Sequence, residues 1–151
     1  MAKDIGEILE SKFSSPQHKA VVHALFIGNF LKNEHSAALK PHNISVQQYN
    51  ILRILNGAKG EKMRMTVVRD RMIEKAPNTT RLTDALIERG FIARERCDDD
   101  RRVVYVNITK EGMDFLSKVD KEAAPALEAA YKNLTDEEAV ELDRLLLKLR
   151  S

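Results

Sequence analysis

The chain has 151 residues, enough for one ordinary domain with its own core but too few for two. Hydrophobic residues make up 43% and charged residues 32%, a balance that excludes a disordered chain. The single cysteine, Cys97, excludes an internal disulfide and a cysteine-only zinc site. No apolar run approaches the roughly 18 residues that span a membrane. The first residues lack the apolar core of a signal peptide, so we expect a cytoplasmic protein with no membrane association.

The net charge of +2 names no partner, but the charge is unevenly distributed. Residues 59–102 hold 12 Lys and Arg against 9 Asp and Glu, whereas residues 103–151 hold 7 against 10. Six of the basic residues are arginines after residue 80: Arg81, Arg89, Arg94, Arg96, Arg101 and Arg102. A basic centre beside a more acidic C-terminal third is the kind of pattern that nucleic-acid-binding proteins carry.

The first half of the chain predicts two helices. Ser15-Pro16 is a helix start, and Pro41 ends the run that follows, so a long helix is predicted over residues 16–40. Its apolar residues cover more than one face, which indicates burial by more than its own domain. A capping box, Ser45–Gln48, opens a second helix that ends at Gly57.

Two shorter helices and a hairpin follow. Thr66 can cap the first of these helices, and Pro77 is placed to be the first residue of the second, which ends at Gly90. The hydrophobic period then changes from 3.6 to 2. This change predicts strands over residues 92–97 and 103–108 with a polar hairpin tip between them.

Two more helices end the chain. Thr109 caps a long one, in which Pro125 predicts a kink, and the capping box Thr135–Glu138 opens the last. Apolar side chains step by three or four along both helices. The domain is too small to bury the apolar faces of the long helices at both chain ends. The simplest partner for these faces is a second copy of the chain.

The order helix, helix, short turn, helix and two-stranded hairpin is that of a winged helix-turn-helix. We therefore expect a mainly α protein, a winged helix-turn-helix with long N- and C-terminal dimerisation helices. Residues 1–151 would form a single domain, with dimerisation helices at about 16–44 and 113–150 and the winged unit at about 45–112. Such a unit places its second helix in the DNA major groove and its hairpin on the backbone or in the minor groove.

Three segments are distinctive: SVQQYNILRIL at residues 45–55, TTRLTDALIERGFI at 79–92 and the wing motif DDRRVVYVNITKEG at 99–112. With these segments in this order, residues 16–150 resemble the MarR (multiple antibiotic resistance) family of transcriptional regulators. The resemblance implies a homodimeric repressor that binds double-stranded DNA at an inverted-repeat operator. It also implies a dimer interface built from the first and last helices.

The resemblance assigns a role to the wing tip. Asp99 and Arg101 occupy the positions at which the family inserts an arginine into the minor groove and orients it with an aspartate. A narrow minor groove concentrates negative potential, which a guanidinium exploits best. A solvated hairpin tip explains the same charges.

The start of the predicted fourth helix offers the side chains that read bases. Asparagine pairs with adenine, arginine with guanine, and threonine methyls meet thymine methyls. The plain alternative makes Thr80 a packing residue and Arg81 a phosphate contact, and leaves Arg64 solvated. The candidate DNA contacts are Arg64, Pro77, Asn78, Thr79, Thr80, Arg81, Asp99, Arg101 and Arg102.

Other functions find little support. No nucleophile–base pair, nucleotide-binding motif or metal-ligand spacing is present, so we expect neither an enzyme nor a bound cofactor or metal. Cys97 is expected to be a passive thiol. The alternative function is a winged-helix module for protein–protein assembly. Arginines, rather than an apolar patch, on the fourth helix and wing favour DNA over that alternative.

The resemblance also implies a small aromatic effector bound between the dimer helices and the DNA-binding lobe. Candidate lining residues are Phe13, Phe26, Phe30 and Tyr49, and core packing explains these four aromatic residues equally well.

Overall fold

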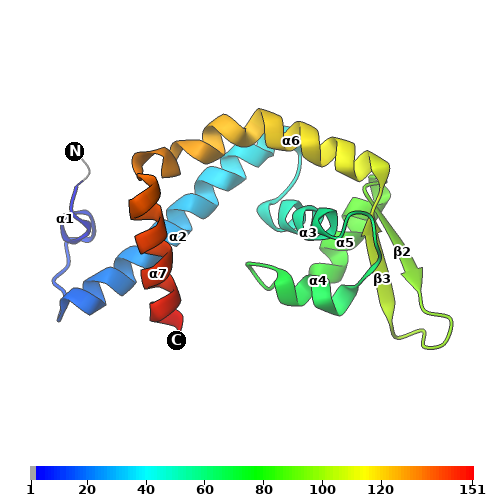
Figure 1. Cartoon of the computed structure of the whole chain (residues 1–151), viewed down its shortest axis with the longest axis horizontal. Helices are drawn as coiled ribbons and strands as arrows, with labels where there is room; N and C mark the ends of the chain where they lie inside the picture. The colour runs from blue at the N-terminus through cyan, green and yellow to red at the C-terminus, as the bar shows by residue number, and fades with distance from the viewer. Residues whose placement is uncertain (1–2) are drawn as a thin grey trace.

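The computed structural model describes residues 3–151. Two long helices, α2 (Pro16–Leu39) and α6 (Lys110–Ala129), pack against each other and carry a lobe of shorter elements beneath one end (Figure 1). A short helix α1 (Ile5–Leu9) precedes α2, and α7 (Asp136–Arg150) ends the chain. None of the helices in residues 3–151 is both long and apolar enough to cross a membrane.

The lobe contains three helices and a small sheet. Its helices are α3 (Val46–Gly57), α4 (Met65–Arg71) and α5 (Thr79–Glu88), and its strands are β1 (Met63–Arg64), β2 (Ile92–Arg96) and β3 (Val104–Ile108). The strands are antiparallel in the order β1-β3-β2, so β3 lies in the middle of the sheet. Single 3-10 turns, η1 (Lys40–His42) and η2 (Tyr131–Asn133), follow α2 and α6. The mainly helical winged helix-turn-helix predicted from the sequence is confirmed.

The predicted helix caps are present. Both capping boxes form, and the Thr109 side chain accepts a hydrogen bond from the backbone N–H of Gly112 at the start of α6. Gly90 follows α5 with φ +75°, the left-handed conformation that ends a helix and that glycine adopts without strain.

Two predicted helix starts are wrong. The helix α4 begins at Met65 rather than after a Thr66 cap, because the pairing of Arg64 with Tyr105 holds the chain extended up to that point. The helix α5 begins at Thr79 rather than Pro77, because the Thr79 hydroxyl reaches back to the Ala76 carbonyl (2.7 Å) and closes a turn ahead of the helix.

The core of the lobe is formed where α3, α5, the sheet and α6 meet. Each of these elements contributes side chains that are at most 1% exposed, namely Ile51, Leu52, Leu55, Leu86, Val106, Ile108 and Leu116. Gly112 lets α6 approach the sheet, since a Cβ there would lie 2.2 Å from the Phe91 carbonyl oxygen. The Phe91 carbonyl accepts the backbone N–H of Thr109 (3.0 Å), so the residue before β2 is bonded directly to the start of α6.

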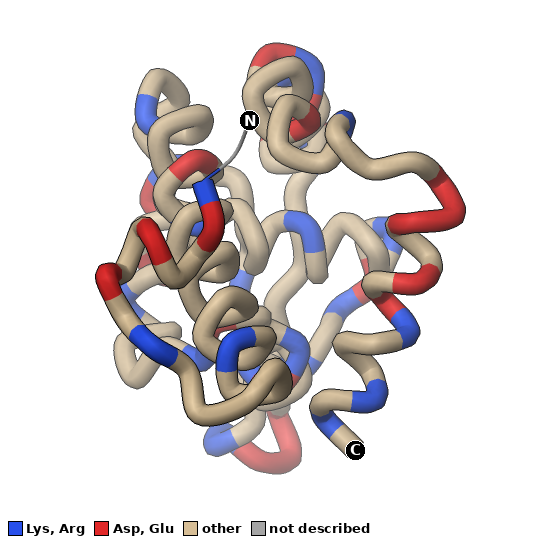
Figure 2. Tube along the Cα trace, turned by 90° about the vertical axis from the view of Figure 1, so that its left-hand side faces the viewer, with Lys and Arg blue, Asp and Glu red and all other residues tan. Residues whose placement is uncertain are grey.

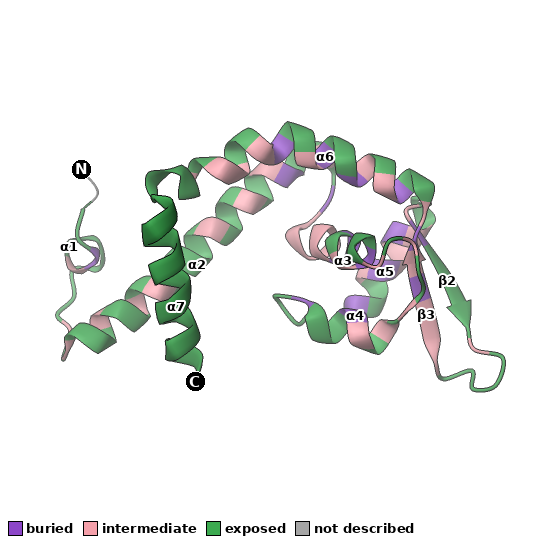
Figure 3. Cartoon of the chain, in the orientation of Figure 1, coloured by how far each residue is buried: buried purple, intermediate pink, exposed green. Residues whose placement is uncertain are grey.

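The opposite end of the molecule has no comparable core. Every residue of α7 is exposed, and so is much of the first half of α2 (Figure 3). We call residues 16–30 together with 136–150 the helical end. Ten large apolar side chains there are 38% to 70% exposed: Val21, Leu25, Ile27, Phe30, Val140, Leu142, Leu145, Leu146, Leu147 and Leu149.

Candidate nucleic-acid interface

The first turn of α5 presents three of its four polar residues to solvent. Asn78, Thr80 and Arg81 are exposed, whereas Thr79 is only 5% exposed and its hydroxyl is bonded to the Ala76 carbonyl. The threonine that packs inward is therefore Thr79 and not Thr80. Pro77 is exposed in the turn that leads into α5.

The tip of the wing is a tight turn built on Asp100. Its carbonyl accepts the N–H of Val103 (2.9 Å), and its carboxylate accepts the N–H of Arg102 (3.0 Å). Aspartate is favoured at the first position of such turns for this reason. Arg101 and Arg102 occupy the two central positions and are exposed, as is Asp99. No ion pair within residues 3–151 joins Asp99 to Arg101, so the orienting contact that the family resemblance implies is absent here.

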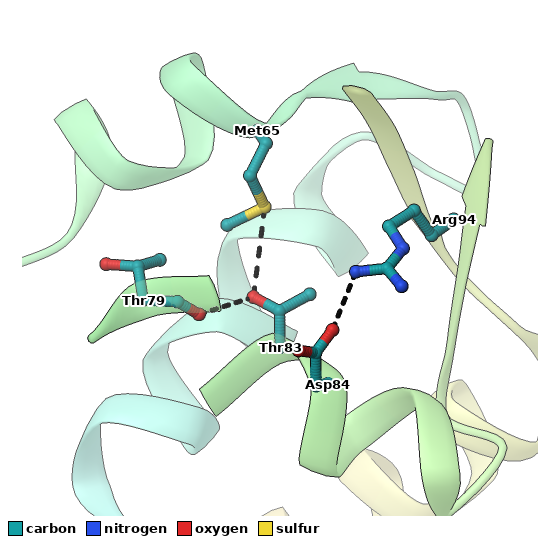
Figure 4. Close-up of polar contacts among 5 residues, drawn as sticks. All are labelled: Met65, Thr79, Thr83, Asp84 and Arg94. Carbon is teal, nitrogen blue, oxygen red and sulfur yellow. Dashed lines mark hydrogen bonds and ion pairs between the residues drawn. The ribbon is translucent and has the colours of Figure 1, made fainter. Parts of the chain in front are cut away.

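An ion pair connects the wing to α5. The Arg94 guanidinium on β2 lies 2.6 Å from the Asp84 carboxylate on α5 (Figure 4). Beside it, Thr83 is 2% exposed and donates its hydroxyl to the Thr79 carbonyl (2.8 Å), with the sulfur of Met65 3.8 Å away. These contacts set the wing, α5 and the start of α4 relative to one another.

A hollow of about 350 Å³ opens between these three elements. Its walls come from the start of α4, one face of α5, and the two wing strands with the turn between them. We call it the arginine hollow, and it is lined by Arg64, Met65, Thr66, Thr80, Thr83, Arg94, Arg102, Val103 and Val104. It brings together Arg64, Thr80 and Arg102, three of the residues singled out from the sequence.

Sequence reasoning missed the roles of Arg94 and Asp84. The position of Arg94 could have been predicted from the sequence of β2, because every second side chain of a strand points to the same face. Arg94 therefore follows the buried Ile92 on the core face of the sheet, at the point where that face leaves the core. Asp84 gave no comparable local signal.

The arginines of the basic segment fall into two groups. Arg94 is paired within the protein. Arg89 lies over the stacked rings of Phe91 and Phe115, 4.7 and 5.0 Å from their centroids, and donates hydrogen bonds to the carbonyls of His42 and Asn43. In the described part of the chain, the other guanidiniums of this segment form no ion pair with a carboxylate: Arg64, Arg69, Arg71, Arg81, Arg96, Arg101 and Arg102.

A polar cluster joins the lobe to α6. The Tyr49 hydroxyl donates to one oxygen of Asp120 (2.7 Å), and the Arg53 guanidinium lies 2.9 Å from the other. Burial, with the Asp120 carboxylate as a second cause, raises the pKa of Tyr49 to about 12. The phenol therefore stays protonated and can serve as a donor at every physiological pH.

The helical end carries charge of both signs. The first turn of α7 holds Asp136, Glu137 and Glu138, and its last turn holds Lys148 and Arg150. Figure 2 shows this change from acidic to basic along α7 toward the C-terminus. This charge distribution complements the helix dipole. Because both signs are present, it favours neither an acidic nor a basic partner.

Known proteins share this sequence and architecture. The family of transcriptional regulators described as SarA/Rot matches residues 34–121. A relative from Bacillus subtilis, named as the uncharacterized HTH-type transcriptional regulator YpoP, is 31% identical over 106 residues, 70% of this chain and 74% of that protein.

Solved structures agree with the fold. A MarR transcription factor from Planctomyces limnophilus superposes with a TM-score of 0.70 at 31% identity, covering 89% of this chain and 98% of its own. A mutant MarR from Escherichia coli, solved in complex with operator DNA, superposes with a TM-score of 0.74 at 21% identity, covering 98% and 99%. The predicted resemblance to MarR regulators is confirmed.

Proposed function

Because the chain belongs to the SarA/Rot family of transcriptional regulators and has the MarR-type winged-helix fold, we propose that it is a homodimeric repressor of transcription. It binds an inverted-repeat operator in double-stranded DNA and acts in the cytoplasm. Regulators of this family and fold are not enzymes.

The observation that carries the proposal is the arrangement of unpaired cations on one lobe. Arg81 on α5 and Arg101 on the wing are exposed and form no ion pair within residues 3–151. The Asp84–Arg94 ion pair joins α5, which would enter the major groove, to the wing, which would reach the minor groove. Asn78 and Thr80 extend the reading surface, with Pro77 beside them. Thr79 falls outside it because it is buried.

We propose residues 16–44 and 113–150 as the dimerisation part and residues 45–112 as the DNA-binding lobe. The exposed apolar faces of α2 and α7 support this proposal, because a second copy of the chain would bury them in a dimer interface. A groove between these helices is lined by apolar and polar side chains of both: Gln17, Ala20, Val21, Ala24, Leu145, Leu146, Lys148 and Leu149. Two-fold symmetry then requires half-sites about one helical turn apart, roughly 34–36 Å.

A second hollow of about 350 Å³ supports an effector site between α2 and the lobe. The Lys32–Glu74 ion pair (3.0 Å) crosses from α2 to the loop before α5 beside it. Its lining is Gly28, Leu31, Lys32, His35, Val46, Gln47, Asn50, Ile73 and Glu74. The four aromatic residues expected from the sequence do not line it: Tyr49 bonds to α6, and Phe13 packs edge-on against His18. We propose a small apolar molecule as the occupant.

The test is selection of duplexes from a random library by the purified full chain. We expect a sequence with dyad symmetry to be enriched, and the complex to contain two copies of the protein. An assembly module that does not bind DNA would enrich nothing, and a selected site without dyad symmetry would contradict the dimer.

A further inference from the structure

The turn between α5 and β2, residues 89–91, is bonded to both places where the chain passes between the long helices and the winged lobe. The first passage leads from α2 through η1 into α3, and the second leads from β3 through Thr109 into α6 (Figure 1). The contacts of this turn therefore connect α5 to the helices that carry the lobe.

Arg89 holds the first passage. Its guanidinium donates one hydrogen bond to the Asn43 carbonyl (2.6 Å) and another to the His42 carbonyl (3.2 Å). Carbonyls at the end of a helical turn are left without a partner within that turn, and a charged donor is a strong partner for them. The same guanidinium lies over the stacked rings of Phe91 and Phe115, and Phe115 belongs to α6. One side chain thus connects the end of α5 to the corner between α2 and α3 and to α6.

The two residues after Arg89 hold the second passage. The Gly90 carbonyl accepts the hydroxyl of Thr109 (2.6 Å), and the Phe91 carbonyl accepts the backbone N–H of the same residue (3.0 Å). The first passage also contacts α6 directly, since His42 Nε2 lies 3.6 Å from the Glu122 carboxylate. The turn that ends α5 is therefore fixed to both passages and to one of the long helices.

The place of this turn in the fold connects it to the spacing of half-sites. In a dimer on DNA, α5 would enter the major groove of each half-site, and the long helices would set the distance between the two copies of α5. One base pair added between the half-sites moves them apart by about 3.4 Å and rotates one against the other by about 35°. How far a dimer follows this displacement depends on how firmly each lobe is held on the long helices.

We propose that Arg89 is a positioning residue that determines which half-site spacing the dimer accepts. It acts through the corner between α2 and α3 and through α6, and not through a contact with a base. The proposal rests on the proposed function, because it requires a dimer on an inverted repeat. Arg89 is exposed and lies outside the buried core, so removing its side chain should loosen the lobe on the long helices without unfolding it.

The test measures affinity for duplexes in which the two selected half-sites are separated by one or two base pairs more or fewer than in the selected site. Wild-type affinity should fall about tenfold or more for one base pair, because the second lobe no longer reaches its half-site. In Arg89→Ala this loss should shrink to about threefold or less, because a loosely held lobe follows the displaced half-site. Affinity for a duplex with one intact half-site should stay within about twofold of wild type, since α5 and the wing are unchanged.

Two further variants separate the geometry of Arg89 from its charge. Arg89→Lys keeps a positive charge but lacks the planar fork that bonds two carbonyls, so its spacing preference should lie between those of wild type and Arg89→Ala. Lys118→Ala removes an exposed cation from α6 and should keep the wild-type preference. A cooperative thermal transition checks that each variant is folded, and if Arg89→Ala is unfolded, the broadened preference of Arg89→Lys decides the test.

The outcomes distinguish this role from the wider function. An Arg89→Ala protein with the sharp spacing preference of the wild type would overturn the role and leave the proposed function standing. A loss at the single half-site as large as the loss at the full site would also overturn it, because Arg89 would then act within the lobe or on DNA itself. A wild type without any preferred spacing would contradict the inverted-repeat operator and the proposed function with it.

Discussion

The winged lobe and the helical end treat their apolar side chains in opposite ways. The lobe places leucine, isoleucine and valine from α3, α5, β3 and α6 in one core where each is at most 1% exposed. On α7, Leu142, Leu145 and Leu146 are each 45–48% exposed. The lobe buries its apolar side chains within a single copy, whereas those of the helical end stay exposed within residues 3–151, and we propose that a second copy covers them.

The largest expected effect comes from charging the helical end. Leu142→Asp/Leu145→Asp/Leu146→Asp should convert a dimer to monomers, because carboxylates cannot be buried in an apolar interface without a partner. Each monomer would then bind only one half-site. Affinity for the full operator should fall about a thousandfold or more, because the two half-sites are no longer bound together. Sedimentation at micromolar concentration and mobility shift measure the two effects. Arg144→Ala, which removes an exposed ion pair on α7, should remain dimeric, and a monomeric wild type would contradict the comparison.

The outer surface of the winged lobe should determine which DNA sequence the protein prefers. Arg81→Ala removes an exposed side chain from the first turn of α5 and should cost about 1–3 kcal/mol per half-site if it reads a guanine edge. Specificity should relax at one base pair, which single-base variants of the selected duplex would locate. A uniform loss over all variants would make Arg81 a phosphate contact instead.

The interior of the lobe should tolerate no added volume at Gly112. In Gly112→Ala the new Cβ would lie 2.2 Å from the Phe91 carbonyl oxygen and 2.8 Å from Ile108 Cγ1. Separation of α6 from the sheet should lower the free energy of unfolding by about 2–3 kcal/mol, measured by denaturant titration. Gly57→Ala, whose Cβ would meet nothing within 4 Å, should be neutral or stabilising.

The wing tip should contribute DNA affinity that does not depend on the base sequence. Arg101→Ala should weaken binding to all sites by a similar factor and reduce the salt dependence by about two counterions per dimer, each worth a slope of roughly −0.9. Lysine at this position should restore only part of the affinity, because the ammonium ion is more strongly hydrated. Unchanged affinity and slope would show that the wing tip does not touch DNA.

The polar contact between α3 and α6 predicts the smallest effect. The raised pKa of Tyr49, about 12 against 10 for a free phenol, favours the folded state fully below pH 10, and that stabilisation is lost as the pH rises through 12. Because the ring is partly exposed, the contribution after solvent screening is about 1 kcal/mol. Absorbance titration should show a late tyrosine ionisation that disappears in Tyr49→Phe and persists in Tyr131→Phe.

Local signals predicted most of the fold. Capping boxes at Ser45 and Thr135 and the glycine after α5 mark boundaries through contacts within a few residues, and these were found as predicted. The strand β1 was missed because two residues carry no periodicity, and their pairing with Tyr105 and Val106 depends on chain forty residues away. The short helix α1 was missed as well, since five residues give too little pattern.

The candidate site was less predictable because it is assembled from several elements. The residue types on α5 and the wing could be named from the sequence. Which of Thr79 and Thr80 turns inward depended on the hydrogen bond to Ala76. The arginine hollow could not be named, since Arg64, Thr80, Arg94 and Arg102 meet only after β1 pairs with β3 and the Asp84–Arg94 pair forms.

The strand order β1-β3-β2 leaves the outer edge of β2 without a partner strand in the described chain. An unpaired edge is a template on which another extended chain can add, the first step of aggregation. Along this edge β2 places Arg94, Glu95 and Arg96 in succession, all exposed, and a second strand would have to desolvate them. These charges therefore keep the sheet from growing by edge-to-edge pairing, and replacing all three with apolar residues would leave the edge open to a second strand.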